Sequence, residues 1–217
     1  MRTRVKICCI MSTEEAALAV REGADAIGLV GAMPSGPGVV DRSTIRAIAR
    51  TVPPAVATFL LSSATGAEGL ADDARDAGAG VLQIVDAPEP GALAAVRLLV
   101  PALKLVQVIH VAGEAAIAEA RGAAAEADAI LLDSGRPGAL VRELGGTGRV
   151  HDWEISRAVV EAVTVPVFLA GGLDPANVVR AIRMVRPFGV DLCSGVRTGG
   201  RLDEAKLAAF MGAVRTA

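Results

Sequence analysis

Short apolar runs alternate with helix-like stretches along the whole chain, and this alternation most limits what the chain can fold into. Eight of these runs, each four to seven residues long, have the length of a strand. They lack the polar alternation of a strand with one face in water, so they are typical of a parallel sheet covered by helices. The predicted strands are residues 5–9, 26–30, 56–61, 81–85, 103–109, 129–132, 166–170 and 190–193.

The stretches between the predicted strands carry signals of helix starts. Ser12 and Glu15 have the spacing of a capping box, in which a hydroxyl and a carboxylate each accept a backbone amide. Asp174 precedes Pro175, and proline suits the first position of a helix. Two further N-cap candidates are Asp152 and Asp203. We therefore expect a helix after each strand.

Eight strand–helix units in 217 residues predict an α/β fold, a single (β/α)8 TIM barrel that forms one domain over residues 1–217. A similar short Gly/Ala/Asp segment begins four of the predicted strands. These segments recur at intervals of about two strand–helix units. The alternative is a doubly wound parallel sheet. Such a sheet usually has fewer strands, and no GxGxxG loop follows the first predicted strand.

Composition excludes several classes of protein. Hydrophobic residues make up 52% of the chain, which excludes a disordered chain. No apolar run approaches the ~20 residues that a membrane-spanning helix needs. The net charge of −2 and the 2% aromatic content argue against nucleic-acid and membrane partners. Because the three cysteines are an odd number and the N-terminus shows no signal-peptide core, we expect reduced thiols in a cytoplasmic protein.

In a barrel of this kind, functional side chains lie at the carboxyl ends of the strands. Cys8 lies at the carboxyl end of the first predicted strand, one residue before its last, and Lys6 shares its face because side chains alternate along a strand. A thiol beside an ammonium can act as a nucleophile or a base, although a free cysteine is more often inert and buried. Asp133 follows the sixth predicted strand and is a candidate acid, with the cap of a turn as the alternative.

Glycine-containing loops follow the last three predicted strands. Gly171 and Gly172 come after the seventh strand, Ser194 and Gly195 after the eighth, and Gly146 lies in a glycine-rich stretch after the sixth. Such loops let backbone amides approach an anion, and the loops after strands seven and eight are the usual phosphate site of a barrel. Two tight turns are the alternative reading.

No metal-binding spacing is present in the sequence. His110 and His151 are the two histidines, and no HxH, HExxH or CxxC pattern occurs. The sequence therefore predicts a site that works without a metal.

The motifs in their order resemble those of the phosphoribosylanthranilate isomerase family. The resemblance is carried by residues 6–9 (Lys-Ile-Cys-Cys), 131–134 (Leu-Leu-Asp-Ser), 145–148 (Gly-Gly-Thr-Gly) with Asp152 and Trp153, 169–173 (Leu-Ala-Gly-Gly-Leu) and 189–196 (Gly-Val-Asp-Leu-Cys-Ser-Gly-Val). It covers nearly the whole chain. It implies a (β/α)8 barrel of tryptophan biosynthesis that converts an aminated ribose phosphate to a ketose by an Amadori rearrangement, without cofactor or metal.

The resemblance also implies roles for individual residues. Cys8 matches the general base and Asp133 the general acid of the family. The phosphate-binding positions match Gly171, Gly172, Ser194 and Gly195, and Lys6, Gly146 and Asp191 fall among the further substrate-binding positions. The partner that follows from this is a small phosphorylated substrate, by default phosphoribosylanthranilate, bound by a monomer or a homodimer.

The departures from the family pattern lie where the aromatic acid would be recognised. Gly38 stands where the family has an Arg that faces the anthranilate carboxylate, and Val85 stands in place of a His. Cys9 replaces a Gly and Arg197 replaces a Glu. Polar side chains that could contact the substrate instead are Arg136, Arg142 and His110.

Two enzyme hypotheses follow from these departures. Either Arg136 or Arg142 replaces the missing Arg, or the substrate is another aminated sugar phosphate. In the second case, Gly38→Arg is expected to increase turnover of phosphoribosylanthranilate. A non-catalytic barrel that binds a phosphorylated metabolite is the alternative from another class of protein. The presence of both Cys8 and Asp133 argues against it, since binding alone needs neither.

Overall fold

Eight parallel strands form a closed barrel in the computed structural model, which describes residues 2–34, 36–135 and 150–217. Each strand pairs with the next along the chain, and β8 pairs with β1. The strands are β1 (Arg4–Ile7), β2 (Ala26–Val30), β3 (Ala57–Ser62), β4 (Val81–Ile84), β5 (Lys104–His110), β6 (Ala129–Asp133), β7 (Val167–Leu169) and β8 (Gly189–Leu192). The predicted (β/α)8 barrel is confirmed, and a doubly wound sheet is wrong.

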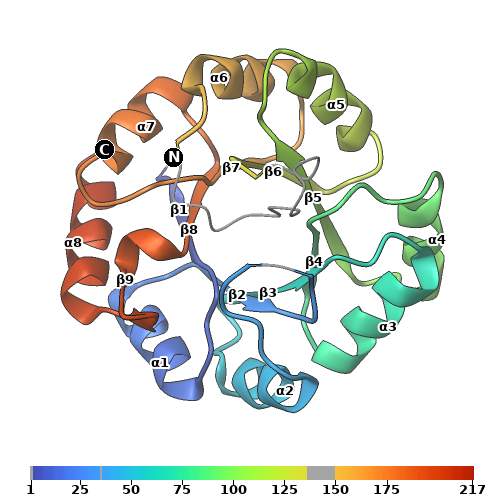
Figure 1. Ribbon diagram of the computed structural model, residues 1–217, viewed down its shortest axis with the longest axis horizontal. Coiled ribbons are helices and arrows are strands. Elements are labelled where there is room, and N and C mark those ends of the chain that lie inside the picture. The colour runs from blue at the N-terminus through green and yellow to red at the C-terminus, as the bar shows by residue number, and fades with distance from the viewer. Residues whose placement is uncertain (1, 35, 136–149) are drawn as a thin grey trace.

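Helices surround the barrel, one outside each pair of neighbouring strands (Figure 1). They are α1 (Thr13–Glu22), α2 (Arg42–Thr51), α3 (Ala67–Ala77), α4 (Ala92–Leu99), α5 (Ala115–Ala124), α6 (Trp153–Ala162), α7 (Val178–Val185) and α8 (Glu204–Arg215). Between β8 and α8 lie a single 3-10 turn, η1 (Ser194–Val196), and a hairpin of β9 (Arg197–Thr198) and β10 (Arg201–Leu202). In the described part of the chain, no helix is both long enough and apolar enough to cross a membrane.

All eight predicted strands overlap observed ones, with ends that differ by at most two residues. The largest difference is at β1, which ends at Ile7 and not at residue 9. Cys9 has a φ of 60°, in the left-handed region, which ends the extended conformation there. Cys8 and Cys9 therefore belong to the turn that leaves the strand at the carboxyl end of the barrel.

The core has two layers. The larger layer lies between the strands and the helices and includes Val5, Ile7 and Leu192. The smaller layer fills the barrel interior, where the rings of Phe59 and Phe168 meet edge to face with centroids 5.8 Å apart. Because side chains alternate along each strand, a polar side chain that shares a face with the interior layer must be solvated by other polar groups inside the barrel.

Three of the predicted helix caps are confirmed. Ser12 accepts the amide of Glu15, Asp152 that of Glu154, and Asp203 that of Lys206. The other half of the capping box is wrong, because the Glu15 carboxylate accepts the amide of Met11 at 3.0 Å and turns toward other partners.

The predicted helix start at Asp174 and Pro175 is also wrong. The Asp174 carboxylate accepts the amides of Ala176 and Asn177, at 2.8 and 2.9 Å, and so caps a turn. The helix α7 begins only at Val178. Aspartate and proline are common in turns as well as at helix starts. These two residues alone therefore do not distinguish an isolated turn from the first turn of a helix.

The turns that follow β7 and β8 press against one another. A side chain at Gly195 would place its Cβ 2.1 Å from the carbonyl oxygen of Leu173. Only glycine allows this approach, so the two glycine-containing loops lie side by side at the carboxyl end of the barrel.

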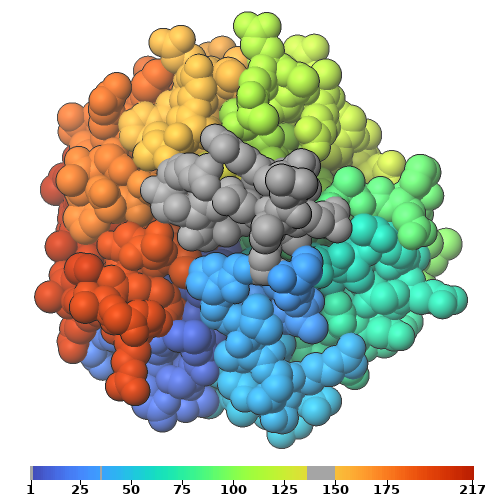
Figure 2. Space-filling view, viewed as in Figure 1, coloured from blue at the N-terminus to red at the C-terminus, as the bar shows by residue number. Residues whose placement is uncertain are grey.

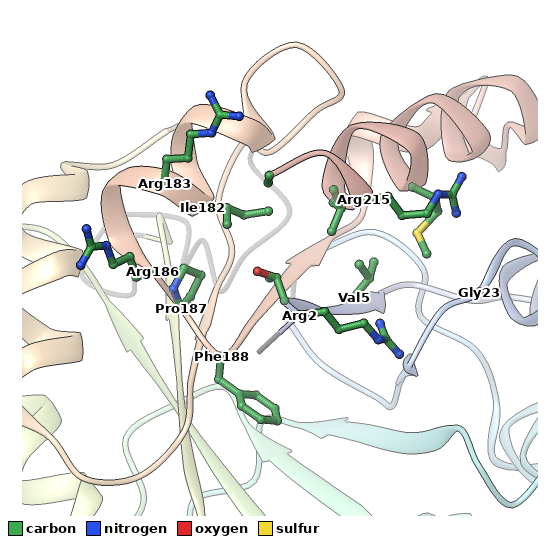
Figure 3. A pocket seen from close by; sticks show the side chains of 13 residues that line it. Arg2, Val5, Gly23, Ile182, Arg183, Arg186, Pro187, Phe188 and Arg215 are labelled. Atoms are coloured by element: carbon green, nitrogen blue, oxygen red, sulfur yellow. The ribbon is translucent and has the colours of Figure 1, made fainter.

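A separate hollow of about 1010 Å³ lies at the amino end of the barrel, beside the starts of β1 and β8 (Figure 3). Its apolar lining includes Ile182, Pro187 and Phe188. Arg183, Arg186 and Arg215 stand at its rim, and their guanidinium groups point away from one another (Figure 3). The strand ends that carry the candidate catalytic residues lie at the opposite end.

We expect Gly195→Ala to destabilise the protein. The added methyl group would overlap the Leu173 carbonyl, and overpacking of this kind typically costs about 1–3 kcal/mol. Urea denaturation would measure the loss. The matched control is Gly212→Ala in α8, where a Cβ would meet nothing within 4 Å, and where alanine should stabilise the helix by about 0.5 kcal/mol. Equal stability of the two variants would contradict the prediction.

Candidate active site

A buried ion pair joins the first and last strands inside the barrel. The Nζ atom of Lys6 lies 2.9 Å from Oδ1 of Asp191, and the two residues are direct partners in the β1–β8 register. The Lys6 side chain is fully buried. Burial favours the neutral amine, but Asp191 and the Cys8 thiol outweigh it and raise the pKa of Lys6 above its ordinary value. Lys6 is therefore a permanent cation inside the barrel.

The thiol of Cys8 lies beside this cation. A Cβ atom added at Gly28 would be 2.8 Å from Sγ of Cys8 and 3.0 Å from Nζ of Lys6, so both groups converge above this glycine of β2. The strand alternation predicted that Lys6 and Cys8 share a face, and this is confirmed. The amide of Cys8 donates to the carbonyl of Leu192 at 2.8 Å, which fixes the backbone that carries the thiol.

Asp133 occupies the end of β6. Burial raises the pKa of its carboxyl group, although the Ser134 amide, which donates to Oδ1 at 2.7 Å, and His110 favour the ionised form. His110 is the register partner of Asp133 on β5, and its Nε2 lies 3.1 Å from the carbonyl oxygen of Val85. The raised pKa increases the fraction of the neutral carboxylic acid at Asp133, the form that can donate a proton.

The loop after β7 has a backbone conformation that requires glycine. Gly171 and Gly172 have φ values of 84° and 64°, a conformation that glycine adopts without strain. Since Gly195 touches Leu173, the turn at Ser194 and Gly195 adjoins this loop. The four predicted phosphate-binding residues are therefore close together.

His151 adjoins the same loop and was not among the residues predicted for the site. Its Nδ1 lies 2.9 Å from where a Gly171 Cβ would be, and this atom has no hydrogen-bond partner among the described residues. Nε2 lies 2.7 Å from Oγ of Ser156, which itself donates to the Asp152 carbonyl. Position in the sequence gave no hint of this contact, since His151 precedes α6 and Gly171 follows β7.

Cys9 and Gly38 are in contact across the mouth of the barrel. The segment after β2 folds back, so that Val39 pairs with Val30, and Gly38 then lies over Cys9. A Cβ at Gly38 would be 2.4 Å from the Cβ of Cys9, and the φ of Gly38 is 79°. The structure argues against the expectation that Gly38→Arg alone adds a useful contact, because both side-chain and backbone atoms of Cys9 lie where the new Cβ would be.

Three thiols meet at the ends of β1 and β8. Contacts with Cys193 and Cys8, together with burial, raise the pKa of the Cys9 thiol, so it stays neutral. The Cys9 contact and the Arg197 charge lower the pKa of Cys193 despite burial. Cys9 therefore presents an uncharged side chain at the mouth of the barrel. The neighbouring thiols of Cys8 and Cys193 lie in different environments.

Arg197 points away from the barrel centre. It pairs with Glu15 through two hydrogen bonds of 2.9 Å, and the two side chains are only 8% and 13% exposed. The position that departs from the family pattern therefore holds a structural ion pair beside the first turn of α1.

Three of the predicted substrate contacts, Arg136, Arg142 and Gly146, lie outside the described residues. Within the described ranges, no group of three or more His, Cys, Asp or Glu side chains is arranged to hold a metal ion. The chemistry that this arrangement can perform is thus acid–base transfer between a thiol and a partly buried carboxylic acid, beside two loops suited to an anion.

Comparison with known proteins agrees with this geometry. The model of the N-(5'phosphoribosyl)anthranilate (PRA) isomerase family matches residues 5–213. A curated isomerase of that name from Methanocella arvoryzae is 37% identical over 94% of this chain and 94% of its own length.

Solved structures of isomerases with this name are similar along the whole chain. The one from Thermotoga maritima has a TM-score of 0.84 and 28% identity, and the match covers 99% of this chain and 100% of that one. Another, in complex with reduced 1-(o-carboxyphenylamino)-1-deoxyribulose 5-phosphate, has a TM-score of 0.81 and 26% identity, with coverage of 99% and 100%.

His151 predicts a pH dependence of stability. Burial lowers its pKa from 6.5 to about 4. Between these values the unfolded chain binds a proton that the folded chain does not, so the free energy of unfolding falls as the pH drops through this range, by about 3 kcal/mol in total. Urea denaturation of the unmodified protein and of His151→Gln at pH 7 and pH 4.5 would test this. The variant should lose distinctly less stability at pH 4.5, and an equal loss in both would refute the assignment.

Proposed function

The chain belongs to the N-(5'-phosphoribosyl)anthranilate isomerase family, and we propose that it catalyses the Amadori rearrangement of an N-(5-phosphoribosyl) amine, by default phosphoribosylanthranilate, with Cys8 as general base and Asp133 as general acid. The observation that carries the assignment of residues is the convergence of the Cys8 thiol and the Lys6 ammonium above Gly28. An inert buried cysteine does not need a cation beside it. A thiolate inside a barrel does, because burial opposes its charge.

The environment of each group suits its step. Neutral Asp133 donates a proton to the ring oxygen of the ribose, the bond from this oxygen to C1 breaks, and the amine nitrogen supplies the electron pair that forms an iminium ion. Cys8, as a thiolate facing the Lys6 charge, removes the proton from C2. The resulting enolamine becomes the ketose when C1 is protonated and the C2 hydroxyl loses its proton. Burial that raises the pKa of Asp133, and the Lys6 ammonium that lies beside the Cys8 sulfur, are the features that suit the acid and base roles.

Asp191 has a supporting part in this scheme. Burial raises the pKa of its carboxyl group, and the Lys6 ammonium at 2.9 Å opposes that shift. The pair therefore holds the Lys6 charge in place below the thiol. By the family resemblance, Asp191 also matches a carboxylate that lies near the sugar.

We assign the substrate phosphate to the two loops after β7 and β8. The support is the positive φ of Gly171 and Gly172 and their closeness to Ser194 and Gly195. Backbone amides bind a phosphate without adding a charged side chain that would have to be neutralised when the site is empty.

The part of the site that would receive the aromatic acid is built differently from the family pattern. Cys9 fills the space above Gly38, and the imidazole of His110 reaches the Val85 carbonyl, next to the place where the pattern has a histidine. If phosphoribosylanthranilate is the substrate, its carboxylate needs a cation from elsewhere, for which Arg136 and Arg142 are the candidates. All these residues come from one chain, so the site is compatible with a monomer or a homodimer, and the cytoplasmic location expected from the sequence stays a prediction.

We predict that Cys8→Ala and Asp133→Asn each lower kcat by a factor of about 10²–10⁴, the usual contribution of a general acid or base. A steady-state assay with phosphoribosylanthranilate and circular dichroism would separate lost chemistry from lost folding. Asp76→Asn, an exposed aspartate paired with Arg42, is the matched control and should leave kcat within twofold. A folded Cys8→Ala variant with native kcat would remove Cys8 from the mechanism.

A second prediction tests whether the amine carried by the substrate is anthranilate or another one. Gly38→Arg alone should destabilise the protein, because its Cβ would overlap Cys9. Cys9→Gly in addition removes the nearest contact, but Cα of residue 9 would still lie 2.9 Å from the new Cβ and the φ of 79° is strained for arginine, so the turn must shift to admit the side chain. Where the double variant folds, it should raise kcat/KM for phosphoribosylanthranilate tenfold or more over Cys9→Gly alone, which corresponds to about 1.4 kcal/mol of transition-state binding.

The other outcome is equally informative. If the unmodified protein turns phosphoribosylanthranilate over efficiently and Arg136→Ala or Arg142→Ala abolishes this, an arginine from the loop after β6 binds the carboxylate. The tenfold gain would then not appear, and the hypothesis of another aminated substrate would be wrong.

A further inference from the structure

The turn that carries the Cys8 thiol has an unusual backbone. Cys8 is tied to β8 through the Leu192 carbonyl, and the amide of Ile10 donates to Gly28 of β2 at 3.0 Å. Cys9 connects these two fixed points with a φ of 60°, a conformation that a residue with a Cβ rarely adopts. Something must therefore hold Cys9 in the left-handed region.

Arg197 supplies this hold. Its Nη2 donates to the carbonyl oxygen of Cys9, and its Nη1 donates to the carbonyl oxygen of Gly200 at 2.8 Å. The same guanidinium forms the two bonds to Glu15. The hairpin of β9 and β10 lies beside the start of α1, on the same side of the molecule as the end of β1 (Figure 1).

Glu15 fixes the guanidinium in turn. Besides Arg197, its carboxylate accepts the amides of Met11 at 3.0 Å and Leu202 at 2.9 Å. One nearly buried ion pair thus links the turn after β1, the first turn of α1 and the hairpin. The hairpin and the segment after β2 lie on the same face of the molecule, that of the strand ends (Figure 2).

We propose that Arg197 is a positioning residue for the isomerase reaction, which acts through the Cys9 carbonyl to hold the turn that places the Cys8 thiol beside Lys6. The inference rests on the proposed role of Cys8. Without this bond, Cys9 relaxes toward an ordinary φ, and the adjoining Cys8 thiol turns away from its place above Gly28.

Glycine at position 9 removes the need for the hold, since glycine adopts a positive φ without a side-chain penalty. The experiment is therefore a double-mutant cycle of Arg197→Gln and Cys9→Gly, with kcat and KM measured for phosphoribosylanthranilate. Arg197→Gln should lower kcat tenfold or more when Cys9 is present and less than threefold in the Cys9→Gly background, and KM should change less than threefold in both. Equal losses of kcat in the two backgrounds would overturn the proposal, because a merely structural arginine matters equally in both.

One further variant serves as a control, and another replaces Arg197→Gln where that variant does not fold. Arg201→Gln changes an exposed arginine of the same hairpin and should leave kcat within twofold. If Arg197→Gln alone does not fold, Glu15→Gln/Arg197→Gln leaves no unpaired carboxylate and replaces it in the cycle with the same expected values.

A crystal structure of the Arg197→Gln variant tests the inference without a substrate. Residue 9 should leave the left-handed region and the Cys8 Sγ should move from Gly28, whereas an unchanged φ would overturn the proposal. This experiment also separates the positioning role of Arg197 from the proposed role of Cys8. If Cys8→Ala is fully active, the proposed function of Cys8 fails, while the φ of residue 9 still decides whether Arg197 holds the turn.

Discussion

The ion pair of Lys6 and Asp191 is the interaction on which the active end of the barrel depends. It lies where the last strand meets the first, so it is formed only when the barrel is closed in the observed register. A slip of one residue would turn one partner toward the helices and leave the other charged group alone in the interior. Breaking a buried pair in this way typically costs about 3–5 kcal/mol, although such a pair adds little over apolar packing. Its value here lies in register: it fixes Cys8 two residues beyond Lys6 and Cys193 two beyond Asp191.

The arrangement of charges follows from this constraint. The barrel interior holds a cation, a thiol and a carboxylic acid within a mostly apolar layer that includes Phe59, whose ring centroid is 5.2 Å from the Lys6 Nζ. Little water can screen these groups, so each shifts the protonation of the others. The loops outside need only bind the substrate ends, which separates the reacting groups from the groups that select the substrate.

Sequence patterns predicted the parts of the structure that depend on periodicity. The alternation of runs predicted the barrel, strand alternation put Lys6 and Cys8 together, and local spacing predicted the Ser12 cap. The parts that sequence could not predict depend on long-range contacts. Arg197 reaches Glu15 across 182 positions of the chain, and His151 reaches Gly171 through loops with no periodic pattern. The resemblance to the family identified Cys9 and Gly38 as two separate departures. Only the structure shows that the two residues are in contact, so that the side chain at one position limits the space at the other.

The contact of Cys9 with Gly38 has a consequence for the order in which such a site can be altered by mutation. Because only one of the two positions has room for a side chain, a chain with arginine at 38 and glycine at 9 can reach the present pair only if position 38 changes first. The return path has the opposite order. Each position thus sets the fitness effect of a change at the other: from the present pair, glycine at 9 must come before a side chain at 38, and a library that varies position 38 alone would record it as intolerant. The order of the changes, and not only their number, decides whether the mouth of the barrel can be altered there.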